Sequence, residues 1–160
     1  MDEIPVSIEV NGRMQRSAVE PRQLLVHFLR VTAGLTGTHV GCDTSYCGAC
    51  TVLLDGAAVK ACTVLTVQAD GRKVRTVEGL AQPDRPHALQ ESFSRHHALQ
   101  CGYCTPGKLM SAASLLEQAR EVDEAAVRKA LAGNICRCTG YQPIVEAVLD
   151  AARTLRKANA

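Results

Sequence analysis

The stretch Gly41-Cys42-Asp43-Thr44-Ser45-Tyr46-Cys47-Gly48-Ala49-Cys50 decides how the chain folds around it, because it places three cysteines in one short loop. A fourth cysteine, Cys62, follows after eleven intervening residues. We expect Gly41 and Gly48 to take up positive φ and to let the backbone approach closely, so that N–H groups can point at sulfur. The loop is therefore predicted to hold a negatively charged group bound by thiolates.

The second half of the chain carries a second group of four cysteines, namely Cys101, Cys104, Cys136 and Cys138. Thr105-Pro106 is typical of an N-cap followed by proline at the first helical position. Gln142-Pro143 places another proline at the start of a later helix. Two helix N-termini are thus expected to face one site, where their positive ends favour the negative charge of a thiolate-bound cluster.

Two sets of four thiols suit one 2Fe-2S cluster each, and the first set has the Cys-x4-Cys-x2-Cys spacing of plant-type 2Fe-2S proteins. Tetrathiolate zinc is the strongest alternative, but three cysteines crowd one glycine-rich loop and Cys136-x-Cys138 is tighter than the usual zinc spacing. Disulfides are disfavoured in a reducing compartment, and a thioredoxin-like Cys-x-x-Cys would leave six other cysteines unexplained. The five histidines are interpreted as surface or helix-packing residues, because the cysteines already supply two complete ligand sets.

The residues around the first cysteine group predict a small mixed sheet with one helix across it. Asn11-Gly12 and Asp55-Gly56 are hairpin turns between apolar runs. The predicted strands are 6–10, 14–19, 51–54, 58–63 and 73–77. Glu20-Pro21 opens a helix in which Leu24, Leu25, Phe28 and Leu29 share one face, and Gly34 and Gly37 end that pattern.

From Leu80 onward the pattern becomes helical, with predicted helices at 87–97, 108–120, 123–131 and 144–157. Pro83, Asp84 and Pro86 break any element that continues from the first half. We therefore predict two domains, residues 1–79 holding one cluster and residues 80–160 forming a helical bundle that holds the other. The fold class is α+β.

Composition excludes several classes of function. The formal net charge is +2 with both signs interspersed, and the chain has five aromatic residues, so nucleic acid is not expected as a partner. No stretch reaches the length of a transmembrane span, and the acidic N-terminus lacks the features of a secretory signal. We expect a cytoplasmic protein. Glycine-rich nucleotide motifs and paired carboxylates are also missing, so no catalytic residue is expected on this chain.

Three motifs in order carry a resemblance to a known family. They are the stretch at residues 41–52, Gln-Cys-Gly-Tyr-Cys-Thr-Pro-Gly at 100–107, and Gly-Asn-Ile-Cys-Arg-Cys-Thr-Gly-Tyr at 133–141. Over nearly its whole length the chain resembles the iron-sulfur small subunit of the xanthine oxidase family of molybdenum hydroxylases. Residues 21–30 and 41–45 look most like the small subunit of aerobic carbon monoxide dehydrogenase.

The resemblance implies an N-terminal domain like plant-type ferredoxin (β-grasp) and a C-terminal four-helix bundle. It also implies two 2Fe-2S clusters, a large subunit with a molybdenum-pterin cofactor, a medium subunit with FAD, and a dimer of heterotrimers. Electrons would run from molybdenum through both clusters to FAD.

By motif match, the distal cluster would be held by Cys42, Cys47, Cys50 and Cys62. The proximal cluster would be held by Cys101, Cys104, Cys136 and Cys138. The resemblance implies that Gln100 and Cys138 lie next to the pterin. An ordinary amide at a helix end is the alternative for Gln100.

The resemblance leaves the substrate open. Similar small subunits serve N-heterocycle hydroxylases, aldehyde dehydrogenases and 4-hydroxybenzoyl-CoA reductase. Two other functions compete with the subunit hypothesis. A free-standing ferredoxin-like carrier would use a strongly charged face, which this chain does not indicate. A zinc-stapled structural module would be colourless.

Overall fold

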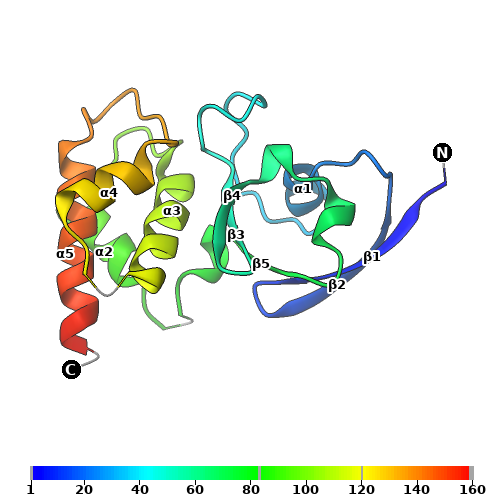
Figure 1. Cartoon of the computed structure of the whole chain (residues 1–160), viewed down its shortest axis with the longest axis horizontal. Coiled ribbons are helices and arrows are strands. Elements are labelled where there is room, and N and C mark those ends of the chain that lie inside the picture. The colour runs from blue at the N-terminus through cyan, green and yellow to red at the C-terminus, as the bar shows by residue number, and fades with distance from the viewer. Residues whose placement is uncertain (1, 83, 120, 159–160) are drawn as a thin grey trace.

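The computed structural model describes residues 2–82, 84–119 and 121–158. A mixed five-stranded sheet occupies the first half of the chain and four helices make up the second half (Figure 1). We call residues 4–79 the sheet half and residues 88–158 the helical half. Within the described residues, no helix is both long and apolar enough to cross a bilayer.

The sheet half begins with a hairpin of β1 (Ile4–Val10) and β2 (Arg13–Val19). Asn11 and Gly12 at its turn have φ of 50° and 78°, as a type I′ turn requires. A second hairpin joins β3 (Thr51–Leu54) to β4 (Ala57–Lys60). The two predicted hairpins are therefore confirmed.

Strand β5 (Lys73–Arg75) joins the two hairpins into one sheet. It pairs in parallel with β1 and antiparallel with β3, giving the order β2-β1-β5-β3-β4. This is the mixed sheet that the sequence predicts. Alternate residues of β1, such as Ile8 and Val10, point into the core beneath it.

Two strands are shorter than predicted. Pairing of β4 with β3 ends where Lys60 meets Thr51, so Cys62 lies in a 3-10 turn (Ala61–Thr63) and not on a strand. Strand β5 stops at Arg75 because the side chain of Asn11 binds Thr76, accepting its backbone N–H at 2.9 Å and donating to its Oγ1 at 2.9 Å. A further 3-10 turn, Val77–Gly79, then leads out of the sheet half.

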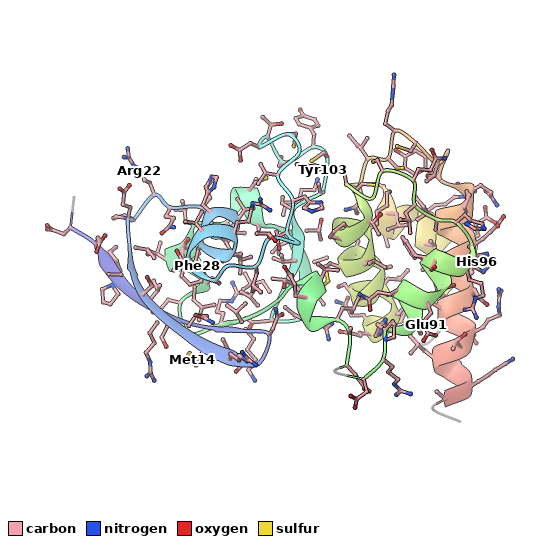
Figure 2. The ribbon with its side chains drawn as sticks, turned by 180° about the vertical axis from the view of Figure 1, so that it is seen from behind. Met14, Arg22, Phe28, Glu91, His96 and Tyr103 are labelled. Atoms are coloured by element: carbon pink, nitrogen blue, oxygen red, sulfur yellow. The ribbon has the colours of Figure 1, made fainter. Side chains whose placement is uncertain are left out.

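The predicted first helix is short and changes its winding. It starts as α1 (Leu25–His27) and continues as a π-helical turn, Phe28–Thr32. Leu25, Phe28 and Leu29 of its apolar face are fully buried, with Phe28 at 0% exposure (Figure 2), whereas Leu24 is only partly buried. This face packs on the sheet and forms the core of the sheet half.

The helical half contains the four predicted helices, α2 (Ala88–Arg95), α3 (Thr105–Gln118), α4 (Glu124–Leu131) and α5 (Gln142–Ala158). Leu89, Phe93, Val127, Ile144 and Val148 meet in its separate core. Thr105 is not the N-cap expected of it, because α3 already begins at Thr105 and Cys104 occupies the cap position without a side-chain hydrogen bond. The predicted end of this helix at Arg120 lies outside the described residues.

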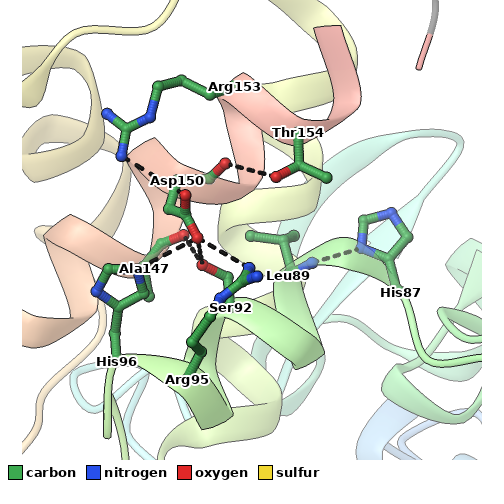
Figure 3. Close-up of polar contacts among 9 residues, drawn as sticks. All are labelled: His87, Leu89, Ser92, Arg95, His96, Ala147, Asp150, Arg153 and Thr154. Carbon is green, nitrogen blue, oxygen red and sulfur yellow. Dashed lines mark hydrogen bonds and ion pairs between the residues drawn. The ribbon is translucent and has the colours of Figure 1, made fainter. Parts of the chain in front are cut away.

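Asp150 joins α5 to α2 through its carboxylate (Figure 3). It accepts hydrogen bonds from Ser92 Oγ at 2.9 Å and Arg95 Nη2 at 2.9 Å, and His96 Nε2 lies 3.2 Å away. The Ser92 hydroxyl also donates to the carbonyl of Ala147 at 2.8 Å. The hydrogen bond from Ser92, followed by the nearby His96 and Arg95, holds the pKa of Asp150 below its ordinary value.

The helical half lies against the sheet half through α3, which packs on β3 (Figure 1). Ser114 Oγ and Gln118 Nε2 both donate to the carbonyl of Gly56, at 3.0 and 3.2 Å. Arg75 of β5 pairs with Glu117 of α3. The domain division at residues 79 and 80 stays a prediction, and Pro83, one of its three breaking residues, lies outside the described residues.

We predict that Asp150→Asn lowers the thermal stability of the chain near neutral pH. A carboxyl whose pKa is depressed on folding stabilises the folded state above the unfolded pKa, and this contribution is lost as the pH falls. The difference in Tm between the variant and the parent should therefore be largest near pH 7 and shrink below about pH 4. Glu146→Gln, which changes an exposed carboxylate one turn earlier on α5, is the matched control. A difference that is independent of pH would contradict the prediction.

Candidate metal centres

The loop at residues 41–50 curls its backbone around two of its own sulfurs. Cys42 Sγ accepts N–H bonds from Cys47 at 3.3 Å and from Thr44 at 3.4 Å. Cys47 Sγ accepts one from Ala49 at 3.5 Å. Backbone N–H groups aimed at sulfur stabilise thiolate charge, as expected of this loop.

The conformation behind these bonds differs in part from the prediction. Gly48 has the expected positive φ, 70°. Gly41 does not, and its role is close approach, since a Cβ there would lie 3.0 Å from Cys47 Sγ. Asp43 and Ser45 supply the other left-handed positions, with φ of 54° and 65°. Short polar side chains tolerate that region better than most residues do.

The eight cysteines are free thiols, all within the described residues, and they come together in pairs. Cys101 and Cys138 lie 3.5 Å apart, sulfur to sulfur. Cys136 contributes to the raised pKa of Cys104, and Cys62 contributes to the raised pKa of Cys50, so these thiols lie near each other. The thiol of Cys42 accepts the backbone N–H of Cys47 at 3.3 Å. Each predicted group therefore consists of two pairs.

Pairing of this kind fits a cluster of two irons better than a single ion. A tetrathiolate zinc site needs four donors around one point. Among the described residues, however, no three His, Cys, Asp or Glu side chains converge closely enough to hold one metal ion. A 2Fe-2S cluster takes four thiolates, two on each of its irons, which matches two adjacent pairs.

The cysteines differ in how readily they lose their protons. Hydrogen bonds from Cys47 and Thr44 lower the pKa of Cys42 to about 6. Burial, together with Cys62, raises the pKa of Cys50 to about 12. Burial also raises the pKa of Cys104 to about 11, whereas hydrogen bonds from Thr139 and the Cys138 N–H outweigh burial and lower that of Cys136 to about 7. Metal binding must therefore release protons from buried thiols.

The two cysteine groups are joined by direct backbone contact. Gly107, at the start of α3, faces the carbonyl of Gly48, which a Cβ at residue 107 would approach to 2.1 Å. The carbonyl of Cys47 accepts a hydrogen bond from Ile135 N at 2.8 Å, and Ile135 directly precedes Cys136. One hydrogen bond thus links a cysteine of the first group to the neighbour of a cysteine of the second.

Asn134 completes this connection from a buried position. Its Nδ2 donates to the Gly48 carbonyl at 2.9 Å and to Thr51 Oγ1 at 3.2 Å. Its Oδ1 accepts from Ser111 of α3 at 2.8 Å. The sequence analysis did not identify Asn134 individually, although it lies inside the quoted motif at residues 133–141.

The second cysteine group is partly exposed at the surface, whereas two cysteines of the first group are buried. Cys101 and Cys138 are exposed, as is Gln100, which lies in the loop between α2 and α3 and not at a helix end. Cys50 and Cys62 are buried. Large apolar side chains stand exposed around the opening, namely Leu99, Tyr103, Ile135 and Tyr141.

Tyr103 also ties the two loops together at this surface (Figure 2). Its hydroxyl donates to the carbonyl of Val40 at 2.7 Å, and its ring stacks on His39 with centroids 4.7 Å apart. His39 Nδ1 lies 2.8 Å from the Tyr103 carbonyl. His39 thus packs against Tyr103.

Comparison with known proteins agrees with this geometry. Residues 8–81 match the family described as a 2Fe-2S iron-sulfur cluster binding domain, and residues 76–149 match a [2Fe-2S] binding domain. The nicotine 6-hydroxylase small subunit of Paenarthrobacter nicotinovorans is 54% identical over 150 residues, covering 94% of this chain and 90% of the relative. Caffeine dehydrogenase subunit gamma of Pseudomonas sp. (strain CBB1) is 45% identical over 152 residues, covering 93% of this chain and 91% of the relative.

A solved structure shows the same fold over the full length. It is quinoline 2-oxidoreductase from Pseudomonas putida 86, with a TM-score of 0.93, 44% identity, and coverage of 100% of this chain and of the matched chain. The fold and the two cysteine groups define an electron-transfer protein with two 2Fe-2S clusters, one in a ferredoxin-like domain and one in a helical bundle. The chain belongs to the iron-sulfur small subunits of the xanthine oxidase family of molybdenum hydroxylases.

We predict that Gly107→Ala destabilises the full chain by about 1–3 kcal/mol, the usual cost of overpacking. The added methyl group would collide with the Gly48 carbonyl, so α3 and the first cysteine loop must separate. Gly133→Ala is the matched control, because a Cβ there meets only the end of Lys60, at 3.4 Å. Urea unfolding of both variants measures the difference. Equal midpoints for the two variants would show that the contact at Gly107 carries no special constraint.

Proposed function

We propose that this chain relays electrons one at a time between a molybdenum-pterin site on a large subunit and FAD on a medium subunit. When bound, each 2Fe-2S cluster accepts and releases single electrons. The chain's own residues hold the two clusters at a fixed separation and bury Cys50, Cys62 and Cys136. The hydrogen bond from Ile135 N to the Cys47 carbonyl is the observation that carries this proposal, because it connects the two cysteine groups directly.

The ligand sets follow from the paired thiols. Cys42 with Cys47 and Cys50 with Cys62 would hold the cluster of the sheet half. Cys101 with Cys138 and Cys104 with Cys136 would hold the cluster of the helical half. Each pair is adjacent in the structure, which supports two thiolates on each iron.

We propose that the molybdenum subunit docks at the exposed opening of the second group. Cys101, Cys138 and Gln100 are all accessible there, and Leu99 and Tyr103 beside them are 39% and 49% exposed. Aromatic residues such as tyrosine are enriched at protein–protein interfaces. We propose that Gln100 and Cys138 face the pterin, and that the cluster of the helical half is the proximal one.

The names of the relatives favour one substrate class. Nicotine, caffeine and quinoline, which appear in the names of the three proteins described above, are all N-heterocycles. We therefore propose that the complete enzyme hydroxylates or dehydrogenates an N-heterocyclic compound. The sequence motifs suggested a carbon monoxide dehydrogenase type of enzyme. That assignment stays a prediction, because these three names do not support it. The cytoplasmic location and the dimer of heterotrimers also stay predictions.

Replacement of single ligands should remove the clusters one at a time. Cys104→Ser should abolish the EPR signal of the helical half, and Cys50→Ser that of the sheet half, because a serine hydroxyl replaces a thiolate ligand in each. Each variant should retain about two irons per chain in place of about four, with the other signal unchanged. The two variants are controls for each other. Two intact signals in either variant would contradict the ligand assignment.

Purification of the native protein tests the subunit role. We expect this chain to copurify with two larger subunits, in a complex that contains molybdenum, FAD and about four irons per copy of the chain. Size-exclusion chromatography and metal analysis measure both. A fully iron-loaded chain that elutes alone would favour the free carrier, and a colourless chain with zinc would favour the structural module.

A further inference from the structure

Lys108 is the one charged side chain in the buried set among the described residues, with 0% of its surface exposed. It lies on α3 four residues after Cys104, and its backbone N–H donates to the Cys104 carbonyl at 3.1 Å. Lysine is rarely buried fully unless it is paired with an opposite charge. The position of Lys108 beside the second cysteine group therefore calls for a physical explanation.

The immediate partners of the ammonium group are polar or aromatic but uncharged. Lys108 Nζ donates to the backbone carbonyl of Asn134 at 2.6 Å and lies 4.7 Å from the centre of the Tyr141 ring. No carboxylate forms an ion pair with it within the described residues. Burial lowers its pKa, and the two groups that oppose this effect are the thiols of Cys104 and Cys136.

An ammonium ion without a counter-charge is costly to bury, because the protein interior replaces its hydration poorly. The proposed ligands of the helical-half cluster are the groups that can supply negative charge here. Four thiolates around a 2Fe-2S cluster leave net negative charge, and reduction adds one more electron. A positive charge held in a dry environment then stabilises the reduced form more than the oxidised form.

We propose that Lys108 is the internal counter-ion of the helical-half cluster and raises its reduction potential. This inference rests on the proposed function, since it requires Cys104 and Cys136 to hold that cluster. Lys108 is a tuning residue, because it acts on the cluster's charge and is not a ligand. Its effect favours the arrival of an electron at the cluster that lies nearer the exposed opening.

The lysine is held in place by the contact between the two halves. Asn134, whose carbonyl accepts from Nζ, is itself bound to Gly48 and Thr51 of the sheet half. The hydroxyl oxygen of Tyr141 accepts a hydrogen bond from the backbone N–H of Cys136, at 2.9 Å. The ammonium group is thus fixed between two residues of the loop that carries Cys136 and Cys138.

The test is an EPR-monitored redox titration of both clusters in the purified complex. Lys108→Met removes the charge and keeps an unbranched side chain, while Lys108→Gln removes the charge and keeps a hydrogen-bond donor. Both variants should make reduction of the helical-half cluster at least about tenfold less favourable, a fall of about 59 mV for one electron. The sheet-half cluster should shift less. Lys129→Met, which removes an exposed positive charge on α4, should leave both potentials unchanged.

The outcomes separate this inference from the proposed function. Two normal signals with an unchanged helical-half potential in both variants would overturn the role of Lys108. An unchanged potential of the helical-half cluster in Lys108→Gln alone would also overturn the role of the charge. The hydrogen bond to Asn134 would then be sufficient to maintain that potential. Absence of a helical-half 2Fe-2S signal from the parent complex would instead overturn the proposed function.

Discussion

The close contact between the backbone of the first cysteine loop and the start of α3 is the constraint on which the rest of the structure depends. A Cβ at Gly107 would meet the Gly48 carbonyl, and a Cβ at Gly48 would meet the Gly133 carbonyl. Asn134 also donates a hydrogen bond to the Gly48 carbonyl. Backbone packed against backbone is stiff, because no rotamer can adjust to relieve it. The separation of the two cysteine groups is therefore set by the fold itself and not by flexible side chains.

This rigidity has a consequence for electron transfer. Electron transfer between two clusters requires a defined distance between them. The protein contributes by binding and orienting the clusters and by setting the electrostatics around them. The link from Cys47 through Ile135 to Cys136 shows how short the connection between the two loops is. The two halves retain separate apolar cores, and the glycine contact holds the two cysteine loops in register.

The two cysteine groups have different environments although both contain four thiols. Half of the second group is exposed beside an apolar edge, whereas Cys50 and Cys62 of the first group are buried. A buried lysine faces the second group, and backbone N–H groups face the first. Charge, exposure and hydrogen bonding are the properties by which a protein sets cluster potentials. The chain thus has the means to make its two clusters inequivalent.

The sequence by itself determined most of the elements and placed the eight cysteines in two groups of four. Three signals are local, namely the hairpin turns at Asn11-Gly12 and Asp55-Gly56, the helical periodicity after Leu80 and the spacing of the cysteines. Local signals can be recognised in the sequence without knowledge of the fold. Only the tertiary structure decided where some elements end and which side chains are buried. It ended β5 at Arg75 through Asn11, placed Cys62 in a turn, gave Gly41 a packing role without positive φ, and buried Lys108. These features could not be derived from sequence pattern, because they depend on three-dimensional contacts, most of them between distant residues such as Asn11 with Thr76 and Lys108 with Asn134.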